Sequence, residues 1–196
     1  RVELKQVLPI YRICLPIITT LSKKGLVVGY AFCEDFVSTG TTWGHTYDTQ
    51  PLLCPNVESV PVIDMPENAN DILGGNSDWI IGYNEPDRRA ASPIDAAIAW
   101  RVVEDRFPDK RLVAPGTVQG SWLWLTDFYD EYNTLYREPP RMDALNLHCY
   151  YYTADDCIVQ LRALEEVGNQ WGINEIWVTE MGAPYGDCSS DYKEIR

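Results

Sequence analysis

Seven short apolar runs alternate with longer segments of helical periodicity, and this alternation limits the folds open to the chain. The runs are residues 26–32, 43–47, 59–65, 79–84, 111–117, 144–150 and 176–179. Several are rich in Val and Ile on both faces, which is typical of buried parallel strands. Strands that alternate with helices form right-handed βαβ units around a parallel sheet. We therefore predict an α/β protein, and the pattern is compatible with either a doubly wound sheet or an incomplete (β/α)8 barrel.

The segments between the later strands carry helical signals. One begins with Ser92 as N-cap, Pro93 at the first helical position and the acidic Asp95 in the first turn. Apolar residues then recur at helical spacing in three sets: Ile94, Ala97, Ile98 and Val102; Leu125, Phe128, Tyr132 and Leu135; Cys157, Leu161 and Leu164. We expect each set to form the buried face of a helix, and Gly168 to end the last helix.

The size and charge of the chain narrow its class. A chain of 196 residues is long enough to bury one hydrophobic core. The net charge of −13 disfavours nucleic acid and anionic membranes as partners and suits a neutral ligand such as a sugar. The apolar stretch 7–21 is too short and too interrupted by proline and arginine to span a bilayer. We expect one domain over residues 25–196 after an N-terminal extension over residues 1–24.

The six cysteines and two histidines indicate whether the chain could bind zinc and whether it is exported to an oxidising compartment. No two cysteines have CxxC spacing, so a closed zinc site is disfavoured. Their pairing cannot be chosen from sequence, and two alternatives stay open: buried free thiols, or a secreted chain with one or two disulfides. We favour secretion because of the function inferred below.

Two glutamates directly follow predicted strands. Glu85 follows 79–84 and Glu180 follows 176–179, while His148 lies near the end of the run 144–150. In α/β barrels these strand ends form the rim that carries the active site. Two carboxylates on one rim suit glycoside hydrolysis, in which one donates a proton and the other attacks the sugar. A separation of about 5 Å gives retention, and repulsion at that distance is expected to raise the pKa of one partner.

The chain resembles glycoside hydrolase family 128, the β-1,3-glucanases of clan A. The specific phrases are GYNEPD at 82–87 and WVTEMG at 177–182. Weaker phrases occur in the family's order over residues 25–184: Thr42–Gly44, Val60–Met65, Ala114–Thr117, Trp124–Phe128 and Leu147–Tyr150. The resemblance implies a TIM barrel of the (β/α)8 type, with Glu85 as acid/base and Glu180 as nucleophile. Asn84 would bond the 2-hydroxyl of the cleaved sugar.

The predicted barrel is incomplete, because the residues after the seventh strand are too few for a helix and an eighth strand. Three explanations are open: the sequence is truncated at its C-terminus, residues 7–13 close the barrel in a permuted order, or the barrel stays open. We favour truncation, since an open edge of a parallel sheet invites aggregation.

Aromatic residues near strand ends are candidates for sugar binding. They are Trp43, Tyr47, Trp122, Tyr150 and Tyr151, whereas Trp79, Trp100 and Trp177 are expected in the core. His148 is expected to contact substrate or the nucleophile. Asp64 is placed either at the cleft or on the surface, and Asp87 is expected to be structural. Asp127, Asp130 and Glu131 are expected on a solvated helix face.

These observations predict a retaining endo-hydrolase of β-1,3-glucan that needs no cofactor or metal. Its partner is an oligo- or polysaccharide, and its oligomeric state is not predicted. Two alternatives remain: a clan A hydrolase of another β-glycan, and a glucan-binding or structural protein on a degenerate barrel.

Overall fold

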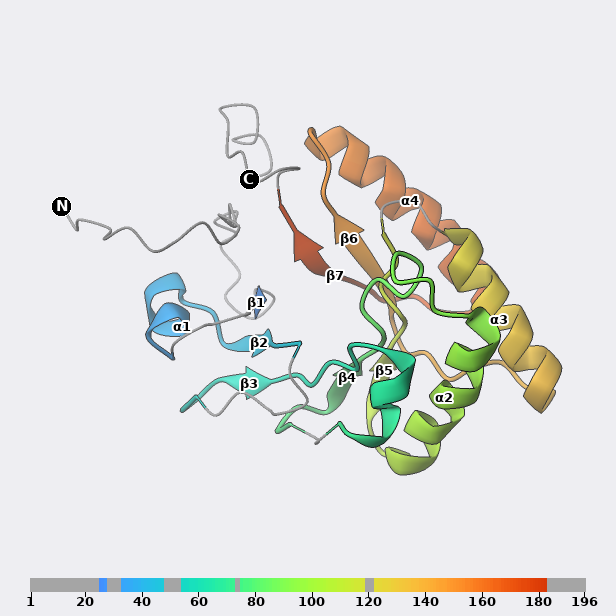
Figure 1. Ribbon diagram of the computed structural model, residues 1–196. Helices are drawn as coiled ribbons and strands as arrows, with labels where there is room; N and C mark the ends of the chain where they lie inside the picture. The colour runs from blue at the N-terminus through green and yellow to red at the C-terminus, as the bar shows by residue number, and fades with distance from the viewer. Residues whose placement is uncertain (1–24, 28–32, 48–53, 73–74, 119–121, 183–196) are drawn as a thin grey trace.

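The computed structural model describes residues 25–27, 33–47, 54–72, 75–118 and 122–182. Its elements, in chain order, are β1 (Gly25–Val27), α1 (Cys33–Thr39), β2 (Trp43–His45), β3 (Glu58–Ser59), the 3-10 helix η2 (Pro66–Asn70), β4 (Trp79–Ile81), α2 (Pro93–Arg106), β5 (Arg111–Val113), α3 (Trp122–Tyr136), β6 (Leu145–Cys149), α4 (Ala154–Trp171) and β7 (Ile176–Met181) (Figure 1). The predicted extension 1–24 and the end of the chain after Gly182 lie outside the described residues.

The strands follow one another in sequence order, and every pair is parallel. The paired sets are β1-β2-β3, β4-β5 and β6-β7. Single parallel bridges join these sets, from Val62 to Ile81 and from Val113 to Ala144. The predicted α/β class with a parallel sheet is therefore confirmed. Closure into a barrel is not shown, because within the described ranges β1 pairs only with β2 and β7 only with β6.

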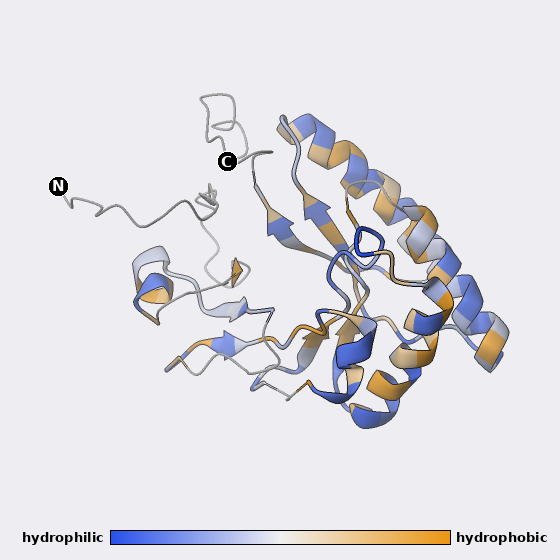
Figure 2. Cartoon of the chain, viewed as in Figure 1, coloured by the Kyte–Doolittle hydropathy of each residue, from blue (hydrophilic) through white to orange (hydrophobic). Residues whose placement is uncertain are grey.

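The sheet is apolar on both faces, as the Val- and Ile-rich runs predict. On one face α2, α3 and α4 cover the later strands, β4–β7, and this layer includes the fully buried Trp100 and Phe128 (Figures 1 and 2). On the other face Val62, Ile81 and Val113 pack with three tryptophans that come from different strands: Trp43, Trp79 and Trp177. Because Trp43 lies in β2 and Trp177 in β7, this second layer connects the first half of the chain to the last strand.

Helix α2 begins at the predicted residue but buries a different face. Pro93 is its first residue after Ser92, although the Ser92 side chain makes no capping hydrogen bond. Ala96, Ala97, Trp100 and Val103 are buried, while the predicted Ile94 and Ile98 are 41% and 48% exposed. Ala97 is thus buried as predicted, whereas the predicted apolar face was wrong for Ile94 and Ile98, because the large Trp100 ring turns toward the core. Its indole N–H donates to the carbonyl of Arg141 from within the core.

The end of α4 also differs from the prediction. The helix continues past Gly168 to Trp171, and Gly172 ends it at a φ of 77°. Gly168 is instead a packing residue, since a Cβ there would lie 2.5 Å from the carbonyl oxygen of Ile173. The N-terminal end is capped by Thr153, whose hydroxyl accepts the backbone N–H of Asp156.

Two disulfides fasten helix beginnings to the sheet layer. Cys33 at the start of α1 is bonded to Cys54, and Cys149 at the end of β6 is bonded to Cys157 in α4. For these four cysteines the disulfide alternative is confirmed, whereas Cys14 and Cys188 lie outside the described residues. None of the described helices is both long and apolar enough to cross a bilayer.

Candidate active site

The two predicted glutamates meet at the carboxyl ends of the strands. Glu85 follows β4, and Glu180 is the penultimate residue of β7. One carboxylate oxygen of each glutamate and Nδ1 of His148 all lie within 4.8 Å of one another. The side chains of Glu85 and Glu180 are 15% and 7% exposed, so both are largely withdrawn from solvent. This carboxylate spacing belongs to the short class, which leaves no room for a water between the second carboxylate and the sugar.

His148 lies between the two carboxylates. Its Nδ1 is 3.4 Å from Oε1 of Glu85 and 3.5 Å from Oε2 of Glu180. The β6–β7 register shifts between Leu147 and His148, and such an irregularity redirects a side chain. Gly116 leaves the space that the ring needs, because a Cβ there would lie 2.5 Å from His148 Nε2. His148, which was expected to contact either substrate or Glu180, therefore lies against the Glu180 carboxylate.

Two tyrosine hydroxyls hold the Glu180 carboxylate. Tyr47 donates to Oε1, and Tyr150 donates to Oε2 at 2.8 Å. Burial, reinforced by the neighbouring Glu180 charge, raises the pKa of Tyr47 well above its usual value. Tyr47 therefore keeps its proton and remains a donor. Both tyrosines were predicted to be in the cleft, and the structure has them as hydrogen-bond donors to the carboxylate.

The electrostatics of Glu85 differ from expectation. The hydrogen bond from His148 lowers the pKa of the Glu85 carboxyl, and Arg88 at 3.2 Å acts in the same direction against the effect of burial. The expected rise in pKa is therefore not found at Glu85, because His148 and Arg88 outweigh the effect of burial. In this arrangement Glu85 is favoured as the carboxylate.

The backbone at Glu85 is unusual. Its φ is 46°, in the left-handed region, although it is not glycine and it precedes Pro86. A residue before proline normally adopts an extended conformation. Two ladder-like hydrogen bonds hold the segment in place: Asn84 N–H donates to the carbonyl of Asp64 at 2.9 Å, and Glu85 N–H donates to that of Gly116 at 2.7 Å.

His45 is a site residue that sequence reasoning missed. It ends β2, is 2% exposed, and its Nε2 lies 3.3 Å from the carbonyl oxygen of Thr179, the residue before Glu180. Burial lowers the pKa of His45 to about 4, so the ring is neutral and Nε2–H donates to that carbonyl. Its place at a strand end, two residues before Tyr47, is the signal that could have found it.

Other predicted residues lie elsewhere. Trp43 begins β2, at the opposite end of the strands from the glutamates, and its ring is 5.3 Å from that of Trp177. Its predicted place in the cleft is therefore corrected: it belongs to the inner tryptophan layer. Trp122 starts α3 and packs against the helix-covered core. Both shifts arise because a tryptophan near a strand or helix end can turn inward as easily as outward.

Two aspartates near the site have structural contacts. Asp64 pairs with Arg89 at 2.6 Å, and the Asp87 carboxylate accepts the N–H of Val118 at 3.1 Å. Asp87 therefore holds a loop, as predicted. The hydroxyl of Tyr151 is buried without a hydrogen-bond partner among the described residues.

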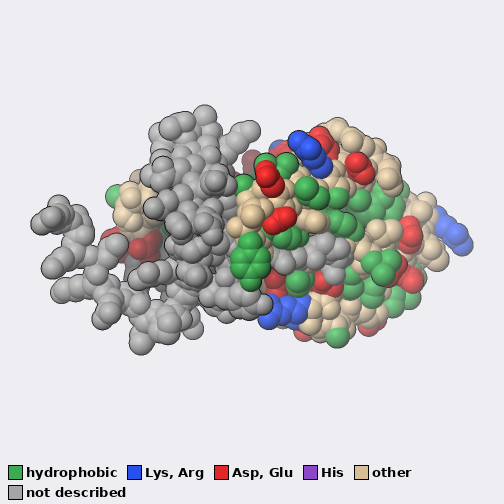
Figure 3. Space-filling model, turned by 90° about the horizontal axis from the view of Figure 1, so that it is seen from above, with side chains coloured by type: hydrophobic (Ala, Val, Ile, Leu, Met, Phe, Trp, Pro, Cys, Tyr) green, Lys and Arg blue, Asp and Glu red, His purple; other side chains and the backbone are tan. Residues whose placement is uncertain are grey.

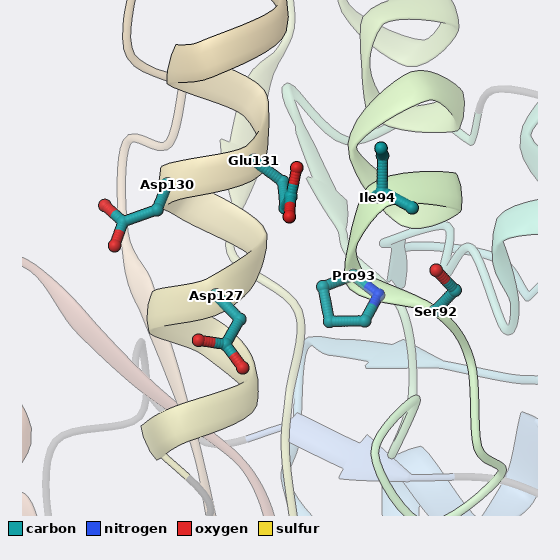
Figure 4. A pocket seen from close by; sticks show the side chains of 6 residues that line it. All are labelled: Ser92, Pro93, Ile94, Asp127, Asp130 and Glu131. Atoms are coloured by element: carbon teal, nitrogen blue, oxygen red, sulfur yellow. The ribbon is translucent and has the colours of Figure 1, made fainter.

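A hollow lies between the first turn of α2 and α3, away from the glutamates (Figure 4). It is lined by Ser92, Pro93, Ile94, Asp127, Asp130 and Glu131. Asp127 and Asp130 are exposed, as expected for a solvated face. Acidic side chains are also scattered over the face seen in Figure 3, in keeping with the negative net charge. The hollow holds no member of the predicted site.

Comparison with known proteins was made at two levels. The sequence profile of the family described as "Glycosyl hydrolase catalytic core" matches residues 25–195. No curated protein sequence matches the chain significantly.

Solved structures of glycoside hydrolase family 128 are similar in fold, which confirms the predicted resemblance. An endo-β-1,3-glucanase of Amycolatopsis mediterranei, in complex with laminaritriose, is 23% identical with a TM-score of 0.67, over 89% of this chain and 78% of that one. An exo-β-1,3-glucanase of Aureobasidium namibiae is 22% identical with a TM-score of 0.68, over 89% and 74%. An oligosaccharide-binding protein of Cryptococcus neoformans is 20% identical with a TM-score of 0.65, over 87% and 70%.

Proposed function

The chain belongs to the glycosyl hydrolase catalytic core family, and on that premise we propose that it is a retaining endo-hydrolase of β-1,3-glucan. The observation that carries the proposal is the approach of Glu85 and Glu180, with His148, to within 4.8 Å at the ends of two strands. Retaining glycosidases hold their two carboxyl groups about 5 Å apart.

In the proposed mechanism Glu180 is the nucleophile. Its carboxylate attacks C1 of the sugar while protonated Glu85 donates its proton to the departing glycosidic oxygen. Glu85 then takes a proton from water, which attacks C1 and releases Glu180. Tyr47 and Tyr150 orient the attacking carboxylate, and the proposed role of Asn84 is to bond the 2-hydroxyl as charge develops at C1.

Glu85 must be protonated before the first step, because it donates the proton to the leaving oxygen. In the described arrangement His148 and Arg88 favour ionised Glu85. A sugar that enters between the carboxylates displaces the long His148 contact and reduces access of water. Both changes disfavour the ionised form, so substrate binding itself prepares Glu85 as the acid.

The comparisons support the substrate and the two catalytic positions. The similar Amycolatopsis mediterranei enzyme was crystallised with laminari-oligosaccharides in variants that replace either of two glutamates, whose spacing in that chain is close to that of Glu85 and Glu180. A β-glucan is accordingly the partner proposed here.

Two further proposals go with this function. The parallel strands are proposed to belong to a (β/α)8 barrel domain over 25–196, since the sequence order of the strands is that of a barrel. Secretion is proposed because disulfides such as Cys33–Cys54 persist in oxidising compartments.

A second candidate function is glucan binding without turnover. It is favoured by the fold similarity to the Cryptococcus neoformans oligosaccharide-binding protein. Release of reducing ends from laminarin separates the two, because a binding protein releases none. A panel of β-glucans with other linkages tests the remaining alternative, a hydrolase of another β-glycan.

The decisive experiment uses Glu85→Gln and Glu180→Gln. Each is expected to lower the rate of laminarin hydrolysis by at least about 100-fold, with the thermal midpoint retained. Glu138→Gln is the matched control, since that glutamate pairs with Arg101 on the helical surface. Wild-type rates in either active-site variant would refute the assignment.

A further inference from the structure

The contact distances around His148 match those of a metal site. Zinc lies about 2.0–2.2 Å from nitrogen and oxygen ligands, so two ligands of a tetrahedral ion are roughly 3.4 Å apart. His148 Nδ1 is 3.4 Å from Glu85 Oε1 and 3.5 Å from Glu180 Oε2. Two edges of such a tetrahedron are thus already present, and the third edge, between the carboxylates, is within 4.8 Å.

The surroundings hold two of the three donors in place. His148 is 1% exposed and confined by Gly116, and Glu180 is fixed by the hydroxyls of Tyr47 and Tyr150. Hydrogen bonds of this kind, one layer outside the ligands, orient metal-binding carboxylates. Each Glu180 oxygen that accepts a tyrosine proton keeps a second lone pair for an ion.

The third metal-ligand candidate, Glu85, can move toward an ion at this site. Glu85 is the more exposed of the two glutamates, and its cationic partner Arg88 has a side chain that is 72% exposed. Arg88 can therefore turn into solvent when a divalent cation takes its place. On ion binding His148 Nδ1 gives up the proton that it donates to Glu85 in the ion-free site, and the neutral ring carries its proton on Nε2. Two carboxylates and this neutral imidazole supply two negative charges, which compensate one divalent ion.

We propose that Glu85, His148 and Glu180 form a site for Zn²⁺ or a related transition-metal ion, and that this ion blocks the active site. A nitrogen ligand beside two carboxylates suits these metals, whereas Mg²⁺ prefers an octahedral shell of oxygens. The blocking rests on the proposed function, because an ion bound to both carboxylates occupies the place of the sugar. Metal binding itself does not depend on that function. Sequence spacing could not predict this site, because its ligands are separated by 63 and 32 residues in the chain.

The test begins with binding, in the absence of glucan. Calorimetric titration of the full chain, purified without a histidine tag, is expected to show Zn²⁺ binding that Glu85→Gln and Glu180→Gln each weaken at least about tenfold. Co²⁺ is expected to give a visible d–d absorption band that the same variants lose. Glu138→Gln is the control and is expected to bind as the wild type does. Absence of Zn²⁺ binding, or equal binding by all variants, would overturn the proposal.

The second part measures hydrolysis of laminarin. Zn²⁺ is expected to inhibit competitively and EDTA to restore the rate, while Mg²⁺ at the same concentration has no effect. Equal inhibition by Mg²⁺, or full activity with Zn²⁺ bound, would overturn the blocking. If the wild type binds Zn²⁺ through these residues but hydrolyses no glucan, the metal site stands and the proposed function fails.

Discussion

His45 links the stability of the site to pH through a single buried ring. Its pKa falls from 6.5 to about 4 on folding because burial disfavours the charged ring, with His148 adding to the effect and the Thr179 carbonyl and Glu180 opposing it. The unfolded chain therefore binds the extra proton more readily than the folded chain. The stability that His45 contributes is present above pH 6.5 and is lost as the pH falls toward 4.

We predict that His45→Gln flattens this dependence. Glutamine can still donate to the Thr179 carbonyl but does not titrate. Between pH 6.5 and 4 the wild type is expected to lose roughly 3 kcal/mol more unfolding free energy than the variant. Urea unfolding at several pH values measures the difference, in which contributions common to both proteins cancel. Parallel curves for the two proteins would show that His45 does not titrate on unfolding.

For the individual site residues, the sequence predicted which side chains follow the strands but not which of these side chains contact one another. Glu85, Glu180, His148, Tyr47 and Tyr150 were all expected at one rim, since parallel strands end together. The bond from His45 to Thr179 spans 134 positions, and no local pattern encodes it. Likewise the lowered pKa of Glu85 depends first on His148, which comes from another strand, and the sequence does not predict that contact.

Among the elements, β6 and α4 are joined by a disulfide at the edge of the candidate site. Cys149 stands between His148 and Tyr150, both of which contact the glutamates, and its partner Cys157 lies in the first turns of α4. The bond thus restrains the strand end that presents these two side chains.

We predict that replacing both Cys149 and Cys157 with serine destabilises the fold and lowers activity together. The short loop between them gives a loss of about 2–3 kcal/mol in unfolding free energy. The rate of laminarin hydrolysis is expected to fall as well, because His148 and Tyr150 lose their restraint. The matched control replaces Cys33 and Cys54 with serine, which removes a disulfide of α1. An equal loss of activity in the control, at the same temperature below both unfolding midpoints, would contradict a local role for the first bond.

The positions of the helices and strands were largely predictable, whereas the side that α2 buries was not. Each of the seven predicted runs overlaps a described strand, and the three long helices occur where the periodicity places them. The third strand, predicted over residues 59–65, is only Glu58–Ser59, and residues 28–32 of the first run lie outside the described residues. The buried side of α2 was mispredicted because Ile94 and Ile98 have the right spacing, but only packing decides that Trp100 turns inward. A glycine near the end of a helical pattern predicts a C-cap, so Gly168 was expected to end the helix. Its actual role, to make room for the Ile173 carbonyl that packs against the helix, is a tertiary contact that local sequence patterns do not predict.

The molecule as a whole is held by the inner tryptophan layer. The Trp177 ring of β7 is 5.3 Å from that of Trp43 in β2 and 4.8 Å from that of Trp79 in β4. These contacts join strands that are not neighbours in the sheet, so they maintain its curvature and bring Glu180 opposite Glu85.

We predict that Trp177→Ala lowers the unfolding free energy by about 2–3 kcal/mol, below the usual cost of a fully buried tryptophan because the ring is partly exposed. Trp177→Phe is expected to lose less, since part of the ring contact remains. Near-ultraviolet circular dichroism and urea unfolding measure the two effects. If alanine and phenylalanine were equally tolerated, the layer would not be what holds the strands together.

The order and direction of the strands could be predicted from the sequence, but the closure of the sheet could not. Alternation of strands and helices implies parallel neighbours. Whether the two outer strands pair depends on the tilt and stagger of every strand in the sheet. Local sequence patterns do not determine these two quantities.

The left-handed backbone at Glu85 has a consequence for how the chain tolerates change. A side-chain-bearing residue at a φ of 46° before proline costs free energy that glycine would not. Among the four described non-glycine residues with a positive φ, Glu85 is the one whose carboxylate lies beside His148 and Glu180. Selection for thermal stability alone would favour glycine at this position, and the more stable protein would lack that carboxylate.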